Sequence, residues 1–152
     1  MFNVTAIQKA ENQLKTYSQF FPKAQADVLK SLLASEESSY VCNLIDSIIQ
    51  KIESMPSTYE TEGQGENAFA ILHYFEGACD FYITEKDIED GQNQAFGLGY
   101  ICFPELGYIC FPELGYISLP ELFKSPYIEL DLHFTPQPVG KLRKELLKRV
   151  GL

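Results

Sequence analysis

Apolar side chains recur every three or four residues through the first third of the chain, a spacing that predicts α-helices. Phe20-Phe21-Pro22 interrupts the first stretch, and proline suits the first turn of the helix that comes next. A serine at position 35 or 38 can cap a third helix, which ends before Pro56. We therefore predict a helical subdomain over residues 1–55. Its apolar positions are Ala6, Ile7, Ala10, Leu14, Tyr17, Ala26, Leu29, Leu32, Leu33, Val41, Leu44, Ile45, Ile48, Ile49 and Ile52.

The pattern changes to short apolar and aromatic runs after residues 56–67, a polar segment with glycines that we interpret as a linker. Residues 68–73 and 79–84 are two such runs, and the Glu76-Gly77 step between them predicts a β-hairpin. Helical spacing returns at residues 141–150, where basic side chains share the segment with an apolar face. We therefore expect an α+β fold, with a small antiparallel sheet in residues 68–152 and a basic C-terminal helix.

An octapeptide stands three times in a row within the predicted sheet, at residues 99–122. Gly99–Leu106 and Gly107–Leu114 both read GYICFPEL, and Gly115–Leu122 reads GYISLPEL. The Tyr-Ile-Cys-Phe stretch predicts a short strand, and Pro-Glu-Leu-Gly predicts a turn, because proline cannot donate to a ladder of backbone hydrogen bonds. The identity of the first two copies favours a recent or engineered duplication over a β-solenoid or a site that binds three times.

The third copy differs from the others where it matters for local structure. Its Ser118-Leu119-Pro120-Glu121 matches a helix capping box, which predicts a short helix over residues 119–125. In the other two copies, identical segments compete for one place in the sheet. Each copy has an even number of residues, so shifting the strand register by one copy leaves the same side chains facing the core. An exposed copy also invites strand pairing between molecules, so we also consider a homodimer through the repeat.

Charge is distributed unevenly along the chain, whose net charge is −9. Residues 60–131 carry fourteen acidic and two basic residues, whereas residues 132–152 carry one acidic and five basic residues. A strongly anionic surface repels phosphate backbones and attracts basic proteins. We therefore expect a basic protein partner, and we do not expect the acidic surface to bind nucleic acid directly.

Candidate contacts for such a partner are the acidic side chains after residue 84 and the glutamates of the octapeptides. The loop at residues 85–94 lacks the ligand order of an EF-hand, so we expect it to be solvated and to hold no calcium. The spacing of Cys102 and Cys110 is explained by the repeat, so we predict no metal site there. The candidate binding residues are Glu85, Asp87, Glu89, Asp90, Glu105, Glu113 and Glu121.

An enzymatic alternative rests on Asp131 and His133, which share one face of a strand predicted at residues 131–134. An aspartate in that position can orient a histidine as a general base, as in a small hydrolase-like enzyme. No nucleophile motif accompanies the pair, and the chain has no P-loop, GxGxxG or HExxH sequence. We therefore favour a non-enzymatic protein and predict no cofactor.

The apolar runs of the chain are short, and this bears on its location. None approaches the roughly twenty residues that a membrane span needs. The first fifteen residues also lack the continuous apolar core of a signal peptide. We expect a cytoplasmic protein with reduced cysteines and no membrane partner.

Residues from about 69 to 134 resemble a known family. The matching stretches are FYITE at 81–85, AFGL at 95–98, PELGYISLPEL at 112–122 and ELDLHF at 129–134. They resemble domain of unknown function 2958, an uncharacterised family found on plasmids and other mobile elements of bacteria. The family pattern has a single PELGY passage after FGL, so this chain carries one octapeptide more. The resemblance implies a genomic setting and brings no established activity.

We therefore favour an acidic interaction protein of a bacterial mobile element. In this interpretation it binds a basic protein surface, as a nucleic-acid mimic or an anti-defence factor. The alternatives are the hydrolase-like enzyme and a structural domain that carries a duplicated or engineered octapeptide.

Overall fold

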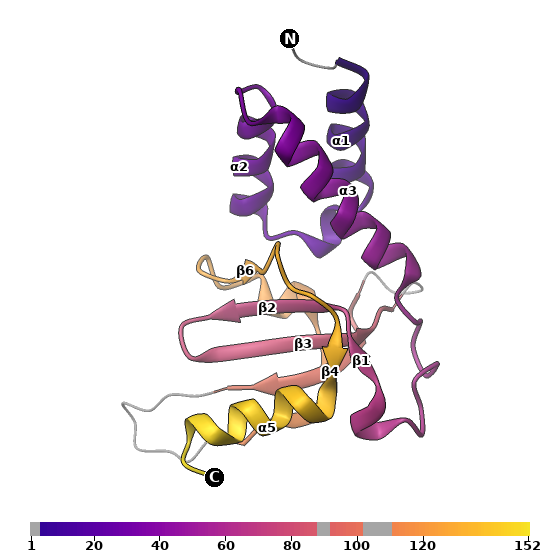
Figure 1. Cartoon of the computed structure of the whole chain (residues 1–152), viewed down its shortest axis with the longest axis vertical. Helices are drawn as coiled ribbons and strands as arrows, with labels where there is room; N and C mark the ends of the chain where they lie inside the picture. Colours follow the sequence, from indigo (N-terminus) through magenta and orange to yellow (C-terminus); the bar gives the residue numbers. More distant parts are fainter. Residues whose placement is uncertain (1–3, 88–91, 102–110) are drawn as a thin grey trace. The chain divides into compact units, whose positions relative to one another are not determined.

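The computed structural model describes residues 4–87, 92–101 and 111–152 (Figure 1). These residues form an α+β fold, as predicted, with helices at both ends of the chain and an antiparallel sheet between them. The chain divides into two compact units, Met1–Ser54 and Met55–Leu152. None of the helices in the described ranges is long and apolar enough to cross a membrane.

The first unit is helical. It contains α1 (Val4–Thr16), the short 3-10 helix η1 (Ser18–Phe20), α2 (Lys23–Leu33) and α3 (Ser38–Ser54). α3 packs against both α1 and α2, and the predicted apolar stripes of the three helices meet in a core that includes Leu14, Leu33, Ile45 and Ile49. The prediction of three helices is confirmed. Pro22 stands just before α2, as its N-cap, rather than inside its first turn.

The second unit is built on a five-stranded sheet with the order β5-β4-β3-β2-β6, in which every pair is antiparallel. The predicted hairpin is formed by β2 and β3, and Gly77 in its turn adopts a left-handed φ of 55° that suits glycine. A separate pair joins β1 to β7. The strands are β1 (Phe69–Ala70), β2 (Leu72–Glu76), β3 (Cys79–Glu85), β4 (Ala95–Tyr100), β5 (Glu113–Ile117), β6 (Glu129–Leu130) and β7 (Gln137–Pro138).

Helix α5 (Val139–Arg149) lies across one face of this sheet (Figure 1). Its Leu142 and Leu146 pack into a core with Leu98 and Tyr100 of β4. The predicted C-terminal helix is confirmed, and it begins two residues before the predicted start at 141. Close packing of the central strands also requires glycine at position 97, because a Cβ there would overlap backbone atoms of β3.

The octapeptides enter the sheet differently from the prediction. β5 takes Glu113 and Leu114 from the second copy and residues 115–117 from the third, and Glu113 pairs with Gly99 of β4. The prediction of a turn at Pro-Glu-Leu-Gly is therefore wrong for residues 113–115, which are extended and paired. Pro112 precedes the strand, where its missing N–H costs no ladder hydrogen bond. The Tyr-Ile-Cys-Phe stretch extends beyond the described residues in both the first and second copies.

The capping box of the third copy is confirmed. Ser118 precedes α4 (Leu119–Leu122), and its hydroxyl accepts a hydrogen bond from the Glu121 N–H at 3.3 Å. Pro120 occupies the first turn of the helix. The α-helix ends at Leu122, three residues earlier than predicted, and hydrogen-bonded turns carry the chain to Ser125.

Candidate functional site: an aromatic and acidic pocket

The predicted acidic contacts fall into two groups. Glu113 and Glu121 are exposed. Glu85 and Asp87 are buried, with only 4% and 6% of their surfaces exposed, so the prediction of a solvated loop is wrong for these two. They are therefore not available as surface contacts for a partner. Three further candidates lie outside the described residues: Glu89, Asp90 and Glu105.

Glu85 is buried because its carboxylate anchors the segment that precedes the sheet. Its Oε1 accepts the Tyr59 N–H at 2.7 Å, and its Oε2 accepts the Thr61 N–H at 2.9 Å and the Thr61 hydroxyl. Hydrogen bonds to an ionised acceptor are stronger than those between neutral groups, which offsets the cost of burying the charge. Residues 56–67, interpreted as a linker from sequence, are thus hydrogen-bonded to β3 and belong to the second unit.

Asp87 is held through its backbone. Its N–H donates to Gln92 Oε1 at 3.0 Å, and Gln92 Nε2 donates back to the Asp87 carbonyl oxygen. Gln92 is itself fully buried and adopts a left-handed φ of 69°. These two hydrogen bonds join Asp87 to Gln92, so the backbone of Asp87 has a structural role.

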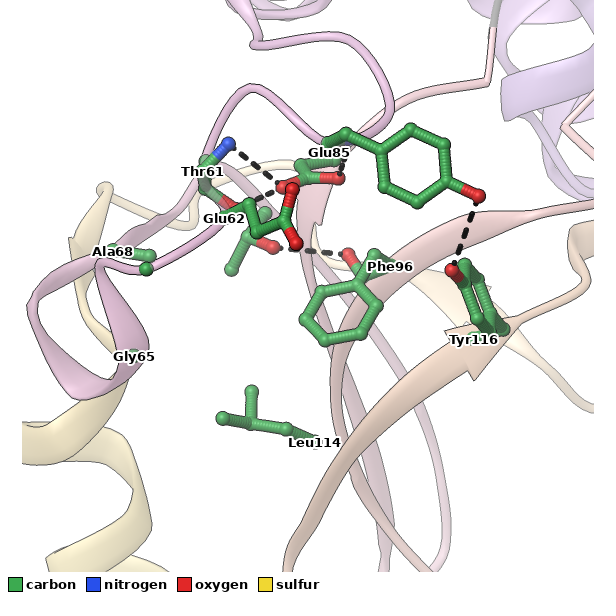
Figure 2. Close-up of a pocket in the computed structure, with 11 residues that line it drawn as sticks. Thr61, Glu62, Gly65, Ala68, Glu85, Phe96, Leu114 and Tyr116 are labelled. Atoms are coloured by element: carbon green, nitrogen blue, oxygen red, sulfur yellow. Dashed lines mark hydrogen bonds between the residues drawn. The ribbon is translucent and has the colours of Figure 1, made fainter.

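A pocket of about 290 Å³ lies beside the Glu85 anchor (Figure 2). Figure 2 shows the carboxylates of Glu62 and Glu85 at one end, Leu114 at the other and the Phe96 ring between them. The remaining lining comes from the turns before the sheet, from the short 3-10 helix η2 (Gly65–Asn67), from Thr84 of β3 and from Tyr116 of β5. Ligand pockets start at about 300 Å³, so this one suits a group the size of a single long side chain.

Two tyrosines form the open side of the pocket. Tyr59 and Tyr116 are 62% and 59% exposed, and their hydroxyl oxygens are 3.5 Å apart, a weak hydrogen bond at best. The Phe96 ring meets the Tyr116 ring edge-on, with centroids 5.6 Å apart. The pocket therefore presents three aromatic rings, two of them accessible from solvent.

The electrostatic character of the pocket is negative. Among the described residues, its lining includes the carboxylates of Glu62 and Glu85 and contains no lysine, arginine or histidine. The contact with the Tyr59 hydroxyl, partial loss of hydration and the negative charges of Glu85 and Glu62 raise the pKa of Tyr116 above its ordinary value. A cation entering the pocket therefore meets a negative field.

The backbone at Tyr59 is unusual. Its φ is 72°, in the left-handed region that bulky side chains rarely adopt. The Tyr59 N–H bond to Glu85 holds this conformation, which turns the aromatic ring toward Tyr116. Strained backbone conformations of this kind cluster at functional sites.

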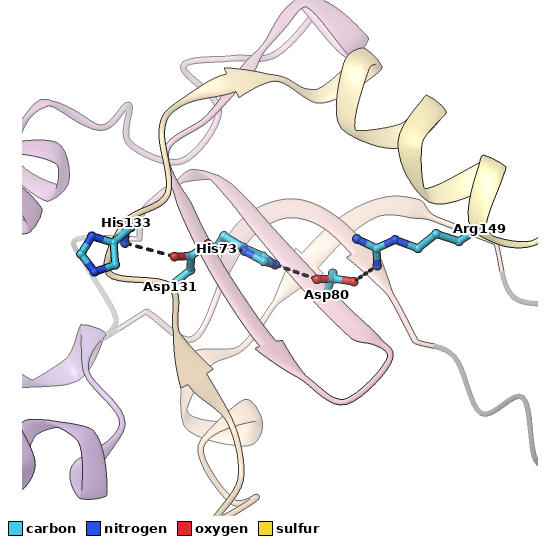
Figure 3. Close-up of polar contacts among 5 residues, drawn as sticks. All are labelled: His73, Asp80, Asp131, His133 and Arg149. Atoms are coloured by element: carbon cyan, nitrogen blue, oxygen red, sulfur yellow. Dashed lines mark hydrogen bonds and ion pairs between the residues drawn. The ribbon is translucent and has the colours of Figure 1, made fainter.

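A second polar cluster crosses the sheet from Asp131, just after β6, to the end of α5 (Figure 3). His73 lies between two carboxylates, with Nε2 at 2.7 Å from Asp80 Oδ1 and Nδ1 at 3.1 Å from Asp131 Oδ2. Its ring stacks on Tyr82 with centroids 4.3 Å apart. The other oxygen of Asp80 accepts a hydrogen bond from Arg149 at 2.6 Å. The cluster ties β2, β3 and α5 together.

The pKa of Asp80 depends on the balance between burial and its two partners. Burial alone would raise its pKa, but the hydrogen bonds from His73 and Arg149 and their positive charges outweigh burial. The pKa of Asp80 is therefore lowered below its ordinary value. The carboxylate is held in its charged form by two partners, which is the arrangement of a structural ion pair.

The prediction of a strand that carries Asp131 and His133 is wrong. Residues 131–134 make a turn rather than a strand, and it is the backbone N–H of His133 that donates to Asp131 Oδ1, at 3.0 Å. Asp131 directs its other oxygen to His73 instead. Because both ring nitrogens of His73 are engaged, neither is open to take a proton from a substrate. These contacts link β2, β3 and α5, and the side chain of His133 is exposed.

The sequence pointed to the acidic residues but missed the aromatic ones that define the pocket. Tyr59, Phe96 and Tyr116 come from three segments that only the fold brings together. The one available signal was Tyr59, an isolated aromatic residue within a polar, glycine-bearing segment. Within the described part of the chain, no group of three or more histidine, cysteine, aspartate or glutamate side chains is arranged to hold a metal ion.

No family model, curated protein or solved structure matches this chain. The resemblance to domain of unknown function 2958 therefore stays a prediction. Any function proposed for the protein consequently depends on the geometry and charge of the pocket.

Proposed function

We propose that this protein is a non-enzymatic interaction protein whose pocket receives a basic side chain of a protein partner. The observation that carries the proposal is the composition of the pocket, whose described lining has aromatic walls, two carboxylates and no basic residue. A lysine or arginine side chain combines an apolar stem with a cationic tip, and this pocket has surfaces for both parts.

Each wall of the pocket has a distinct part in this proposal. Phe96 and Leu114 suit the methylene stem, whereas the exposed faces of Tyr59 and Tyr116 attract the cation. Glu85 supplies charge but little hydrogen bonding, because the backbone and Thr61 already occupy its oxygens. Glu62 is exposed and is the carboxylate expected to pair directly with the ligand.

The wider role that we propose is the one expected from charge and from the family resemblance. Exposed glutamates also lie next in sequence to residues that line the pocket, among them Glu60 and Glu113. Such a surface suits a basic protein that ordinarily binds nucleic acid, and on a bacterial mobile element it would act as a mimic or an anti-defence factor. A hydrolase is not proposed, because residues 131–134 form no strand and the Asp131 oxygens contact His73 and the His133 backbone N–H.

The proposal is tested with defined basic peptides. A fluorescent hexalysine peptide and a hexaglutamate peptide are titrated with the full chain by anisotropy at low and high salt. We expect the basic peptide to bind and the acidic one not to, with affinity falling steeply as salt screens the charges. Absence of hexalysine binding at low salt would refute the function.

Variants distinguish binding in the pocket from attraction to the overall negative charge of the protein. Tyr116→Ala and Glu62→Gln should each weaken hexalysine binding several-fold, since a cation–π or ion-pair contact contributes about 1 kcal/mol. Tyr127→Ala and Glu129→Gln are matched controls, because both residues are exposed and neither lines the pocket. Equal losses in the pocket variants and the controls would assign binding to diffuse charge rather than to the pocket.

A further inference from the structure

The pocket adjoins an open edge of the sheet. β5 is the terminal strand of the five-stranded sheet, and no strand of the described chain pairs with its outer side. Both Leu114 and Tyr116 line the pocket and belong to β5. A ligand in the pocket therefore lies next to a row of backbone groups that are able to form hydrogen bonds.

The register identifies which residues present those groups. Successive residues of an antiparallel strand direct their backbone N–H and C=O groups to alternate sides. The Asp131 N–H donates to the His73 carbonyl oxygen at 2.8 Å, so His73 faces β6 and Tyr74 faces β3. The same alternation applies to the paired residues of β3, β4 and β5. As a result, the backbone N–H and C=O groups of Leu114 and Tyr116 point toward the open edge.

The side chains of these two residues lie on the pocket face of the sheet. Leu114 is opposite Leu98, whose side chain packs under α5, and Tyr116 is opposite Phe96, which lines the pocket. Residues two apart in a strand share a face. The same two residues of β5 thus offer backbone hydrogen bonds at the edge and side chains to the pocket.

We infer that the partner binds as an extended segment of a basic protein, added to the sheet along β5, with alternate lysine or arginine side chains on the pocket face. This inference rests on the proposed function and adds the mode of recognition to it. Backbone hydrogen bonds supply affinity in this mode, and pockets for alternate side chains supply specificity. The negative pocket selects a basic segment, and the exposed Glu113, whose side chain lies on the opposite face of β5, adds negative charge at the same edge. They disfavour a second copy of this chain, whose net charge is also −9.

The test compares three blocked hexapeptides of alternating lysine and valine, which have the same charge and the same side chains. One is unmodified, one is N-methylated at the lysine amides and one at the valine amides. An added strand uses only one of these two sets of amides. We expect one methylated peptide to bind about tenfold more weakly or worse and the other to bind nearly as the parent does. Amide hydrogen exchange at Leu114 and Tyr116 should slow in the complex with the parent peptide.

The failures of the two proposals are distinguishable. If all three peptides bind alike, and Tyr116→Ala weakens each of them, the pocket function stands and the strand addition is wrong. If none binds at low salt, the proposed function itself fails. Dimerisation of the free protein that the parent peptide does not reverse would assign the edge to a second copy and overturn the inference.

Discussion

Removing one octapeptide tests how the repeat is accommodated in the sheet. Gly99 pairs with Glu113, so thirteen residues, 100–112, connect the last paired positions of β4 and β5. Deletion of Gly107–Leu114 leaves a connection of five residues, because the identical Glu105-Leu106 then takes the place of Glu113-Leu114. Five residues are within the ordinary range for a β-hairpin loop.

The expected magnitude is set by the entropy of closing the connection. That cost grows as three-halves RT times the logarithm of length, so shortening from thirteen residues to five recovers about 0.8 kcal/mol. We therefore expect the deletion variant to be more stable than the parent by about 1 kcal/mol, with a midpoint of thermal unfolding roughly 2–4 °C higher. Strand register is retained, because the deletion removes an even number of residues.

Urea unfolding followed by tyrosine near-ultraviolet circular dichroism measures the change, and amide exchange at Leu98 reports on the paired strands. A same-length variant, in which residues 102–109 are replaced by glycine and serine, is the control for sequence at constant length. Its stability should stay within about 1 kcal/mol of the parent, because closure depends on length. A deletion variant destabilised by about 2 kcal/mol or more would mean that the surplus copy makes contacts that stabilise the fold, and the reasoning would be wrong.

Three further predictions address the sheet and its anchors. Glu85→Gln should lower the free energy of unfolding by about 1–3 kcal/mol, because an amide nitrogen would face a backbone donor; an unchanged urea midpoint would contradict the anchor. Because the pKa of Asp80 is lowered in the folded protein, its carboxylate stabilises the fold above about pH 4. This stabilisation is lost as the pH falls through the pKa of Asp80 in the folded state. The urea midpoint of Asp80→Asn should therefore fall less than that of the parent between pH 5 and pH 3, and parallel curves would exclude this role. Gly97→Ala should destabilise the sheet strongly, whereas Gly99→Ala, where the new Cβ finds its nearest neighbour at 3.8 Å, should change the thermal midpoint little; equal effects would refute the packing argument.

Local rules account for the parts of the fold that were predicted correctly. Helical periodicity in the first unit, the turn at Gly77 and the capping box at Ser118 each depend on residues close together in the chain. Binary patterning likewise predicted an apolar face on the last helix, at Leu142, Leu146, Leu147 and Val150. Leu142 and Leu146 are buried, and Leu147 and Val150 are partly buried. These features can be predicted without distant contacts, because the residues nearby in the chain already make other local conformations less favourable.

The remaining features were decided by contacts between residues far apart in sequence. The sequence alone predicted an exposed Glu85. In the folded protein, Tyr59 and Thr61 donate the hydrogen bonds that make burial of its carboxylate stable. His73 and Asp131 are 58 residues apart, so no local pattern joins them. The pocket is likewise absent from any single segment, and the sequence by itself determined only that its region is acidic and aromatic.

The repeat shows the same division most directly. Residues 105–109 and 113–117 have the identical sequence ELGYI, so local preference cannot choose between them. Residues 113–117 form β5, and they lead directly into Ser118 and the helix that it caps. The Leu119 N–H also donates to the Gln92 carbonyl oxygen before β4. The sequence by itself predicted that identical copies would compete for one place in the sheet. Among the described residues, the tertiary structure pairs residues 113–117 with β4, and these residues run without a gap into the anchored helix.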